Sequence, residues 1–213
     1  GVIKSDTTYF DPAMWKIDGY KITNVEEDGG PGQRSIAQLL NLSLNTGATW
    51  MLMQMSKPGG TEINRQGRER WYDYLTNHYR FGKLTGIEQG YEAEGSVPDP
   101  VKGYARDLTY ANSSFGQGLT ATPLQMAAAY SAIVNGGTYY QPRLVDRYVG
   151  VNGATQTIVP KVLKAGVVSP SVSDQMRPLL EYVVENHSIG KRFHQQVYGV
   201  GGKTGTAQGA DPN

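Results

Sequence analysis

The stretch SIAQLLNLSLNTGATWMLMQM, residues 35–55, has the pattern of two short helices joined by a turn. Ser35 stands three residues before Gln38, the spacing of a capping box, so we predict a short helix that starts there. Apolar side chains dominate residues 46–55, which predicts a second, largely buried helix. The intervening Ser43-Leu44-Asn45 is therefore expected to form a turn between two helices.

Composition excludes several classes of protein. The 213 residues carry a net charge of +1, which argues against nucleic acid as a partner. The chain has no cysteine, which excludes disulfide scaffolds, thiolate metal sites and cysteine nucleophiles. Its three histidines lack the close spacing of a zinc-binding helix, so neither a metal nor a cofactor is predicted. No apolar run approaches the roughly 18–20 residues of a membrane span.

Outside the opening stretch, the pattern predicts further helices. Apolar residues among many charges predict an amphipathic helix over 62–79. Thr122 stands three residues before Gln125, the spacing of a capping box, and Pro123 takes the first helical position. This pattern predicts a well-capped helix ending at about residue 134. Apolar spacing predicts another helix from Ser173, and Pro178 requires that this helix start later or kink.

Other segments read as strands or loops. Residues 139–149 and 157–162 are rich in aromatic and β-branched side chains and predict a strand pair. A final short strand is expected at 197–200. Residues 84–119 show little periodicity, so we expect a long surface excursion there.

The sequence Lys203-Thr204-Gly205-Thr206 follows the last predicted strand. A chance Lys-Thr-Gly-Thr has a probability of roughly 0.3% in a chain of this length. A serine enzyme acylated by a peptide needs a proton relay at the leaving nitrogen, a cation for the substrate carboxylate and donors for the oxyanion. Lys203 can supply the cation, Thr204 and Thr206 the hydroxyls, and Gly205 the close approach of a substrate backbone.

Plainer interpretations of the same residues remain open. Ser43 can be a helix-end cap, and Asn45 can be the N-cap of the next helix. Lys203 can be a solvated surface lysine. Short motifs match by chance often enough that these interpretations have to be tested against the structure.

Several stretches together resemble the transpeptidase domain of class B penicillin-binding proteins. They appear in that family's order along nearly the whole chain: Thr7–Asp11, Leu42–Gly47, Phe81–Ile87, Ser114–Gly118 with Ala127–Tyr130, and Gly202–Gln208. The resemblance implies an α+β fold, the penicillin-binding protein transpeptidase or serine β-lactamase-like fold, in which an antiparallel sheet packs against a helical subdomain. Ser43 and Asn45 match the family's second motif, and residues 203–206 its third.

The resemblance also implies an activity. It is that of a D,D-transpeptidase, which cross-links peptidoglycan stem peptides ending in D-Ala-D-Ala through a serine acyl-enzyme and binds β-lactams covalently. Ser43, Asn45 and Lys203 are then catalytic, and Thr204, Gly205 and Thr206 bind substrate, the backbone N–H of Thr206 helping to form the oxyanion hole. Expected partners are a glycosyltransferase and other proteins of cell-wall synthesis.

One motif of the family is missing. Its nucleophile lies in S-x-x-K before the S-x-N motif, and residues 1–42 contain only Ser5 and Ser35, neither followed by Lys three positions on. The formal match Ser188–Lys191 comes after the second motif and is interpreted as loop residues. We therefore expect one partial domain over 1–213, mostly the helical subdomain with part of the sheet, that is inactive alone.

On this interpretation the nucleophile helix lies upstream, and the last strands and the C-terminal helix lie downstream. The parent protein is expected on the outer face of the bacterial cell membrane, held there by an N-terminal anchor outside this sequence. Two alternatives stay open. One is a β-lactam sensor domain of the same fold, and the other is a non-catalytic scaffold that binds partners.

Overall fold

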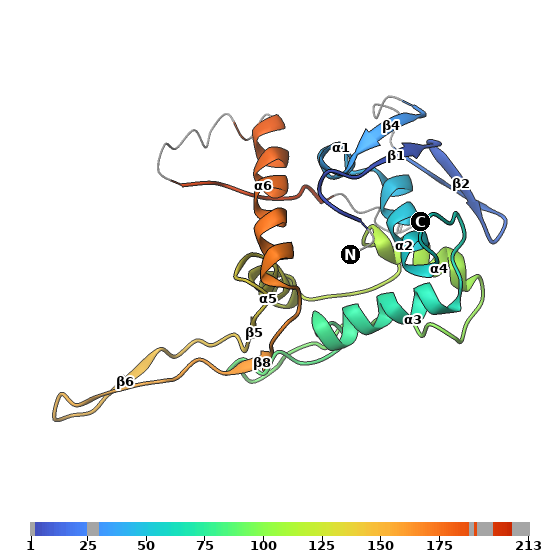
Figure 1. Ribbon diagram of the computed structural model, residues 1–213. Helices are drawn as coiled ribbons and strands as arrows, with labels where there is room; N and C mark the ends of the chain where they lie inside the picture. The colour runs from blue at the N-terminus through green and yellow to red at the C-terminus, as the bar shows by residue number, and fades with distance from the viewer. Residues whose placement is uncertain (1–2, 25–29, 188–189, 191–197, 206–213) are drawn as a thin grey trace, which may run out of the picture. The chain divides into compact units, whose positions relative to one another are not determined.

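The computed structural model describes residues 3–24, 30–187, 190 and 198–205. It divides into two compact units, each with its own packing. Unit 1 comprises residues 1–72, 98–119 and 175–213, and unit 2 comprises residues 73–97 and 120–174. Figure 1 shows the elements of both along the chain. Among the described residues, no helix has both the length and the apolar character needed to cross a membrane.

Unit 1 contains two small antiparallel ladders and most of the helices. β1 pairs with β4, placing Thr8 opposite Ser35, and β2 pairs with β3, placing Met14 opposite Thr23. The elements of this unit are β1 (Thr8–Asp11), β2 (Met14–Ile17), β3 (Tyr20–Thr23), β4 (Gly32–Ser35), α1 (Ile36–Asn41), α2 (Asn45–Ser56), α3 (Arg65–Asp73, its last residue in unit 2), α4 (Arg106–Ser114) and most of α6 (Pro170–Asn186).

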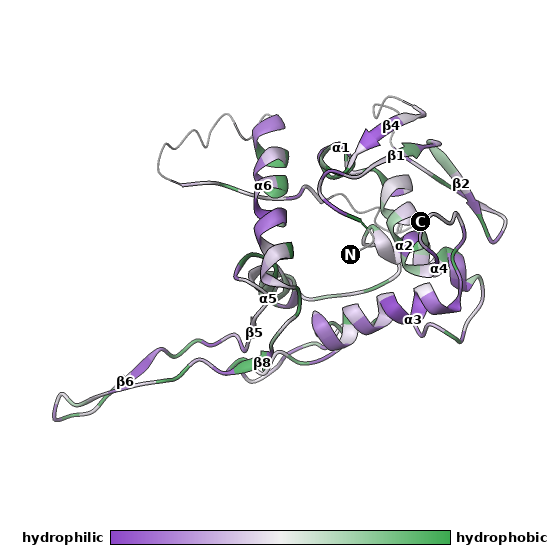
Figure 2. Ribbon diagram, in the orientation of Figure 1, coloured by the Kyte–Doolittle hydropathy of each residue, from purple (hydrophilic) through white to green (hydrophobic). Residues whose placement is uncertain are grey.

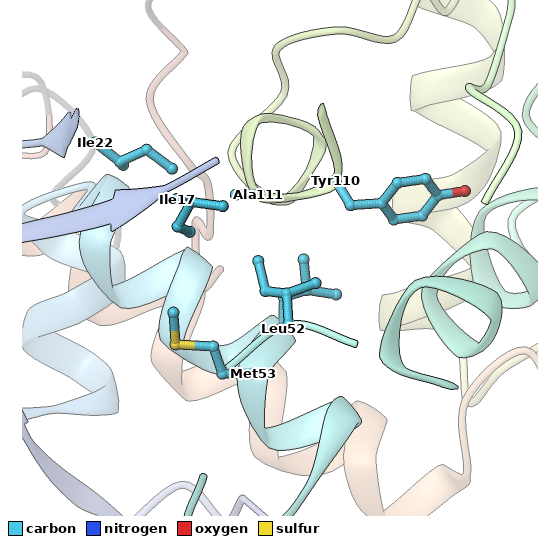
Figure 3. Close-up of a cluster of buried hydrophobic side chains, with 7 residues drawn as sticks. Ile17, Ile22, Leu52, Met53, Tyr110 and Ala111 are labelled. Carbon is cyan, nitrogen blue, oxygen red and sulfur yellow. The ribbon is translucent and has the colours of Figure 1, made fainter. Parts of the chain in front are cut away.

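The main core of unit 1 lies between the β2–β3 ladder and helices α2 and α4. Figure 3 shows its side chains converging from these elements. Its buried members are Ile17, Ile22, Leu52, Met53, Ile63, Tyr110 and Ala111. The Tyr110 hydroxyl donates to the carbonyl of Pro98 at 2.8 Å, so the ring is buried while its polar end stays satisfied. This core fixes α2, the helix that follows the Ser43 turn.

A second apolar cluster packs around Leu44, in the middle of the turn. Tyr9 stacks on Trp50 with ring centroids 4.4 Å apart, and Leu44 is 1% exposed among the apolar residues of α1. Burial raises the pKa of the Tyr9 hydroxyl, and the nearby carboxylate of Asp11 raises it further. Leu44 therefore anchors the middle of the Ser43-Leu44-Asn45 turn in the core.

Gly47 is where these elements approach most closely. A Cβ on Gly47 would lie 2.4 Å from the Tyr9 hydroxyl and 2.6 Å from Leu39 Cγ. We predict that Gly47→Ala lowers the free energy of unfolding by up to about 2 kcal/mol, because overpacking outweighs the gain in helix propensity. Denaturant unfolding checks this, with Gly32→Ala as the control, since a Cβ at Gly32 meets nothing within 4 Å. An unchanged unfolding midpoint for Gly47→Ala would contradict the packing described.

Unit 2 contains a short helix of π form, the helix α5 and a long two-stranded arm. β5 pairs with β8, and β6 pairs with β7 toward the outer end of the arm (Figure 1). The apolar cluster of Ala132, Tyr139 and Val167 joins α5 to the base of the arm. The elements are η2 (Tyr74–His78), α5 (Pro123–Val134), β5 (Tyr139–Tyr140), β6 (Arg147–Val149), β7 (Thr155–Thr157) and β8 (Val162–Lys164).

The helices expected from local capping signals are confirmed. Ser35 and Gln38 form both hydrogen bonds of a capping box at α1, and Thr122 and Gln125 do the same at α5. The helix expected over 62–79 begins at Arg65 and changes to π form at Tyr74. In Figure 2, α3 is coloured mainly as hydrophilic, whereas hydrophobic and hydrophilic bands alternate along α6.

Three expectations about segments were wrong. The excursion expected over 84–119 contains α4, and the N–H groups of its second and third residues, Asp107 and Leu108, donate to Asp18 Oδ2 at 3.1 Å each. Asp18 lies in the β2–β3 turn, far from α4 in the sequence. The residues next to α4 therefore do not indicate where this helix begins. α6 begins at Pro170 and contains Pro178, so the later start offered as one way to accommodate that proline is wrong. Residues 198–205 form no strand, and Gly202 N–H instead donates to the Leu180 carbonyl at 3.1 Å.

Candidate active site

Ser43 occupies a left-handed position at the end of α1. Its φ is +56°, its N–H donates to the Leu40 carbonyl, and the Leu44 N–H donates to the Leu39 carbonyl. These two bonds define a Schellman motif, in which the left-handed position is usually glycine. A serine here carries backbone strain of about 1–2 kcal/mol, and such strain is concentrated at functional sites. The turn thereby presents an exposed Ser43 hydroxyl rather than a buried one.

Asn45 is the first residue of α2 and is not its N-cap. Leu44 occupies the cap position and its side chain makes no capping bond, so the plainer interpretation of Asn45 as a cap was wrong. The Asn45 amide nitrogen instead donates to the carbonyl of Thr23, at the end of β3, at 3.2 Å. The side chain is half-buried and is held from a strand rather than from its own helix.

Lys203 reaches Ser43 across 160 residues of sequence. Lys203 Nζ donates to Ser43 Oγ at 2.7 Å, to Thr204 Oγ1 at 3.2 Å and to the Thr204 carbonyl at 3.1 Å. An ammonium has three donors, and these three acceptors use them all. The side chain is half-buried, and burial lowers the pKa of Lys203 below its ordinary value. Lys203 is therefore not a freely solvated surface lysine.

The chain segment that leads to Lys203 contains two glycines that lie close to α6. Gly201 and Gly202 run beside α6, where a Cβ on Gly201 would lie 3.0 Å from Leu180 Cβ and one on Gly202 would lie 3.3 Å from Val184 Cγ2. Both distances are tighter than ordinary contacts, so a side chain at either position would require this segment or the helix side chain to shift slightly. At Gly205, by contrast, a Cβ would meet nothing within 4 Å. The backbone at Gly205 is open to a ligand.

The structure thus brings four of the six predicted site residues to one place in unit 1. Ser43, Lys203 and Thr204 are joined by hydrogen bonds. Asn45 lies two residues after Ser43 in the sequence. Gly205 adjoins them in sequence, and Thr206 lies outside the described residues. Ser188 and Lys191 of the formal S-x-x-K also lie outside them.

Sequence reasoning missed the groups that support this turn. The carboxylate of Asp11, fully buried at the end of β1, and the amide of Asn24, after β3, both bond to Thr46, next to Asn45. No local pattern marks them, because the contacts join residues 22 and 35 positions apart.

Two of the three histidines have ordinary structural partners. The His187 ring lies 3.1 Å from the carbonyl of Asn41, the last residue of α1. The His78 ring lies 3.2 Å from the Val167 carbonyl. His194 is outside the described residues. Within the described ranges, no group of three or more His, Asp or Glu side chains is arranged to hold a metal ion.

Comparison with known proteins defines the family. The sequence model of the penicillin binding protein transpeptidase domain matches residues 1–213, and the chain belongs to this family. Stage V sporulation protein D of Bacillus subtilis is 32% identical over 94% of this chain and 29% of its own length. Penicillin-binding protein PbpB of Mycobacterium tuberculosis is 36% identical over 70% of this chain and 22% of its own length.

Solved structures agree with the fold. The apo form of penicillin binding protein 3 from Mycobacterium tuberculosis has a TM-score of 0.78 at 28% identity and covers 98% of this chain and 44% of that one. The relatives are class B penicillin-binding proteins, and the mixed helical and antiparallel architecture expected from the sequence is confirmed. The chain spans less than a third of the length of the first two curated relatives.

Proposed function

We propose that this chain supplies part of the active site of a peptidoglycan D,D-transpeptidase that works through a serine acyl-enzyme and is acylated by penicillin. The single observation that carries the proposal is the bond from Lys203 Nζ to Ser43 Oγ. It joins the family's second and third motifs through a hydroxyl that is exposed and a cation that is partly desolvated. A relative in Mesostigma viride, 34% identical over 97% of this chain, carries the name peptidoglycan D,D-transpeptidase FtsI homolog.

The geometry supports a proton relay. When a serine outside this chain attacks the D-Ala-D-Ala carbonyl, the C–O bond forms and the C–N bond breaks, so the leaving nitrogen needs a proton. Ser43 accepts a hydrogen bond from Lys203, which leaves its own O–H free to donate to that nitrogen. Lys203 can then return a proton to Ser43, and its lowered pKa eases that transfer. The proton that the attacking serine releases as its C–O bond forms restores the Lys203 ammonium, so one proton is lost at the nucleophile and one is gained at the leaving nitrogen.

Substrate binding uses neighbouring groups. The positive charge of Lys203 attracts the terminal carboxylate of the stem peptide. The exposed hydroxyl of Thr204 donates a hydrogen bond to that carboxylate, and we assign the same role to the hydroxyl of Thr206. The open backbone at Gly205 lets the peptide lie along this segment. Asn45 holds the amide on the acyl side. The attacking serine belongs to an S-x-x-K segment outside this sequence.

The proposal extends to the whole protein. We place it on the outer face of the bacterial membrane, where its substrate is assembled, and we expect an N-terminal anchor in the full-length protein. A glycosyltransferase is the expected partner, because cross-linking acts on newly polymerised glycan strands.

Intact-mass spectrometry with a fluorescent penicillin tests the proposal. We expect the full-length protein to gain the mass of one β-lactam and the 213-residue chain alone to gain none. An adduct on the 213-residue chain would place the nucleophile inside it and overturn the site assignment. If the folded full-length protein gains no mass either, the non-catalytic scaffold becomes the better interpretation.

A further inference from the structure

A buried carboxylate lies beneath the Ser43 turn. Asp11, the last residue of β1, is 0% exposed. Its Oδ1 accepts from the Thr46 hydroxyl at 2.7 Å and from the Ala13 N–H at 2.9 Å, and its Oδ2 accepts from the Asn24 amide at 3.2 Å. A buried charge is costly unless it is fully hydrogen-bonded, so a carboxylate retained here needs these three donors.

Asn24 passes the connection on to the start of α2. Its Oδ1 accepts from the backbone N–H of Thr46 at 3.0 Å. Thr46 N–H is one of the four N-terminal N–H groups that a helix cannot satisfy internally, and Leu44, at the cap position, offers no side-chain bond. Asn24 therefore caps α2 from another part of the chain, and Asp11 holds the Asn24 amide that does so.

The capped position is next to the candidate catalytic groups. Asn45 precedes Thr46 and is itself bonded to the Thr23 carbonyl, adjacent to Asn24. Ser43 comes two residues earlier in a left-handed conformation that its own side chain does not favour. The first turn of α2 is thus held by the Asp11 side chain at the end of β1, by the Thr23 carbonyl at the end of β3 and by the Asn24 side chain that follows it.

The hydrogen bonds of this network fix which end of the Asn24 amide faces which partner. A carboxylate only accepts hydrogen bonds, so Asp11 forces the Asn24 NH₂ toward itself and the Asn24 carbonyl toward the Thr46 N–H. An amide at position 11 sets its NH₂ against the Asn24 NH₂, or turns so that its NH₂ faces the Ala13 N–H, or makes Asn24 turn so that its NH₂ meets the Thr46 N–H. Each arrangement places two donors against each other and so weakens the hold on the Asn24 side chain that caps α2.

We propose that Asp11 is a positioning residue for the transpeptidase reaction, acting through Asn24 and Thr46 to hold Asn45 and Ser43 in register with Lys203. This inference rests on the proposed function. It predicts that the charge at this place affects the rate of acylation, although Asp11 touches neither substrate nor the reacting atoms. A displacement of about 1 Å in a catalytic group can cost about 100-fold in rate.

The test is an exchange of the two side chains in the full-length protein. Asp11→Asn and Asn24→Asp are each expected to lower the maximal rate of acylation by fluorescent penicillin about 10- to 100-fold, with a smaller change in the half-saturating concentration. The double variant Asp11→Asn/Asn24→Asp restores the chain of donors and acceptors, with the carboxylate now facing the Thr46 N–H. We expect its rate to return to within about threefold of wild type.

Two controls separate positioning from stability. Thr49→Val changes a fully buried residue of the same helix whose hydroxyl has no hydrogen-bond partner among the described residues, and its rate should equal that of wild type. Leu52→Ala should lower the melting temperature by several degrees while its folded fraction acylates at the wild-type rate. If Asp11→Asn loses no more rate than Leu52→Ala, or if the folded double variant stays slow, the inference is overturned. If wild type is not acylated, the proposed function fails and this inference with it.

Discussion

A Ser43→Gly variant is expected to acylate about 10²–10⁴-fold more slowly than wild type and yet to be more stable than Ser43→Ala by about 1 kcal/mol. The loss of rate follows from removing the hydroxyl that relays a proton between Lys203 and the leaving nitrogen. The difference in stability follows from the φ of +56°, where glycine avoids the strain of a Cβ but loses more chain entropy on folding. Rapid-mixing acylation and denaturant unfolding measure the two effects.

Ser43→Gly and Ser43→Ala serve as controls for each other. Both lack the hydroxyl, so both should be slow to a similar degree. If glycine proves no more stable than alanine, the left-handed Schellman turn is not formed in solution. If either variant acylates at the wild-type rate, Ser43 takes no part in the relay.

Lys203→Met is expected to lower the acylation rate by about 10²–10⁴-fold, because it removes both the donor to Ser43 and the charge that attracts the substrate carboxylate. Methionine keeps a side chain of similar length, so the contacts of the stem are largely retained. Lys203→Arg is the matched variant: it keeps the charge, but its planar guanidinium does not replace the three bonds of the ammonium. Its rate should lie between those of wild type and Lys203→Met.

The pH profile adds a second readout for Lys203. Burial lowers the pKa of Lys203, so the ammonium loses its proton at a lower pH than an ordinary lysine. If the relay and carboxylate binding need the ammonium, the rate falls on the alkaline side through this lowered pKa. Lys203→Arg should lose that alkaline limb, because arginine stays charged. An unchanged limb in Lys203→Arg would assign it to another group.

The sequence could predict what depends on neighbours in the chain. The capping boxes at Ser35 and Thr122 were readable because donor and acceptor lie three residues apart. The motif residues Ser43, Asn45 and Lys203 were identified by type and order. What the structure adds is the bond between Ser43 and Lys203, which no spacing along the chain implies.

The failures share a physical cause. α4 begins at a cap supplied by Asp18, and α2 begins at a cap supplied by Asn24, so both helix starts depend on side chains distant in sequence. Asn45 was interpreted as a cap from its residue type, whereas the side chain that bonds a free N–H at the start of α2 is that of Asn24, 22 residues from Thr46. Ser43 occupies a position that glycine favours, which a helix-end pattern does not reveal.

The most direct test of the account is a double-mutant cycle between Ser43 and Lys203, measured as acylation rate by fluorescent penicillin in the full-length protein. If the two act as one relay, Ser43→Ala/Lys203→Met loses little more than the worse single variant, a coupling of at least tenfold, or about 1.4 kcal/mol. If the two losses multiply, Ser43 and Lys203 act independently, and the bond between them is not part of the reaction.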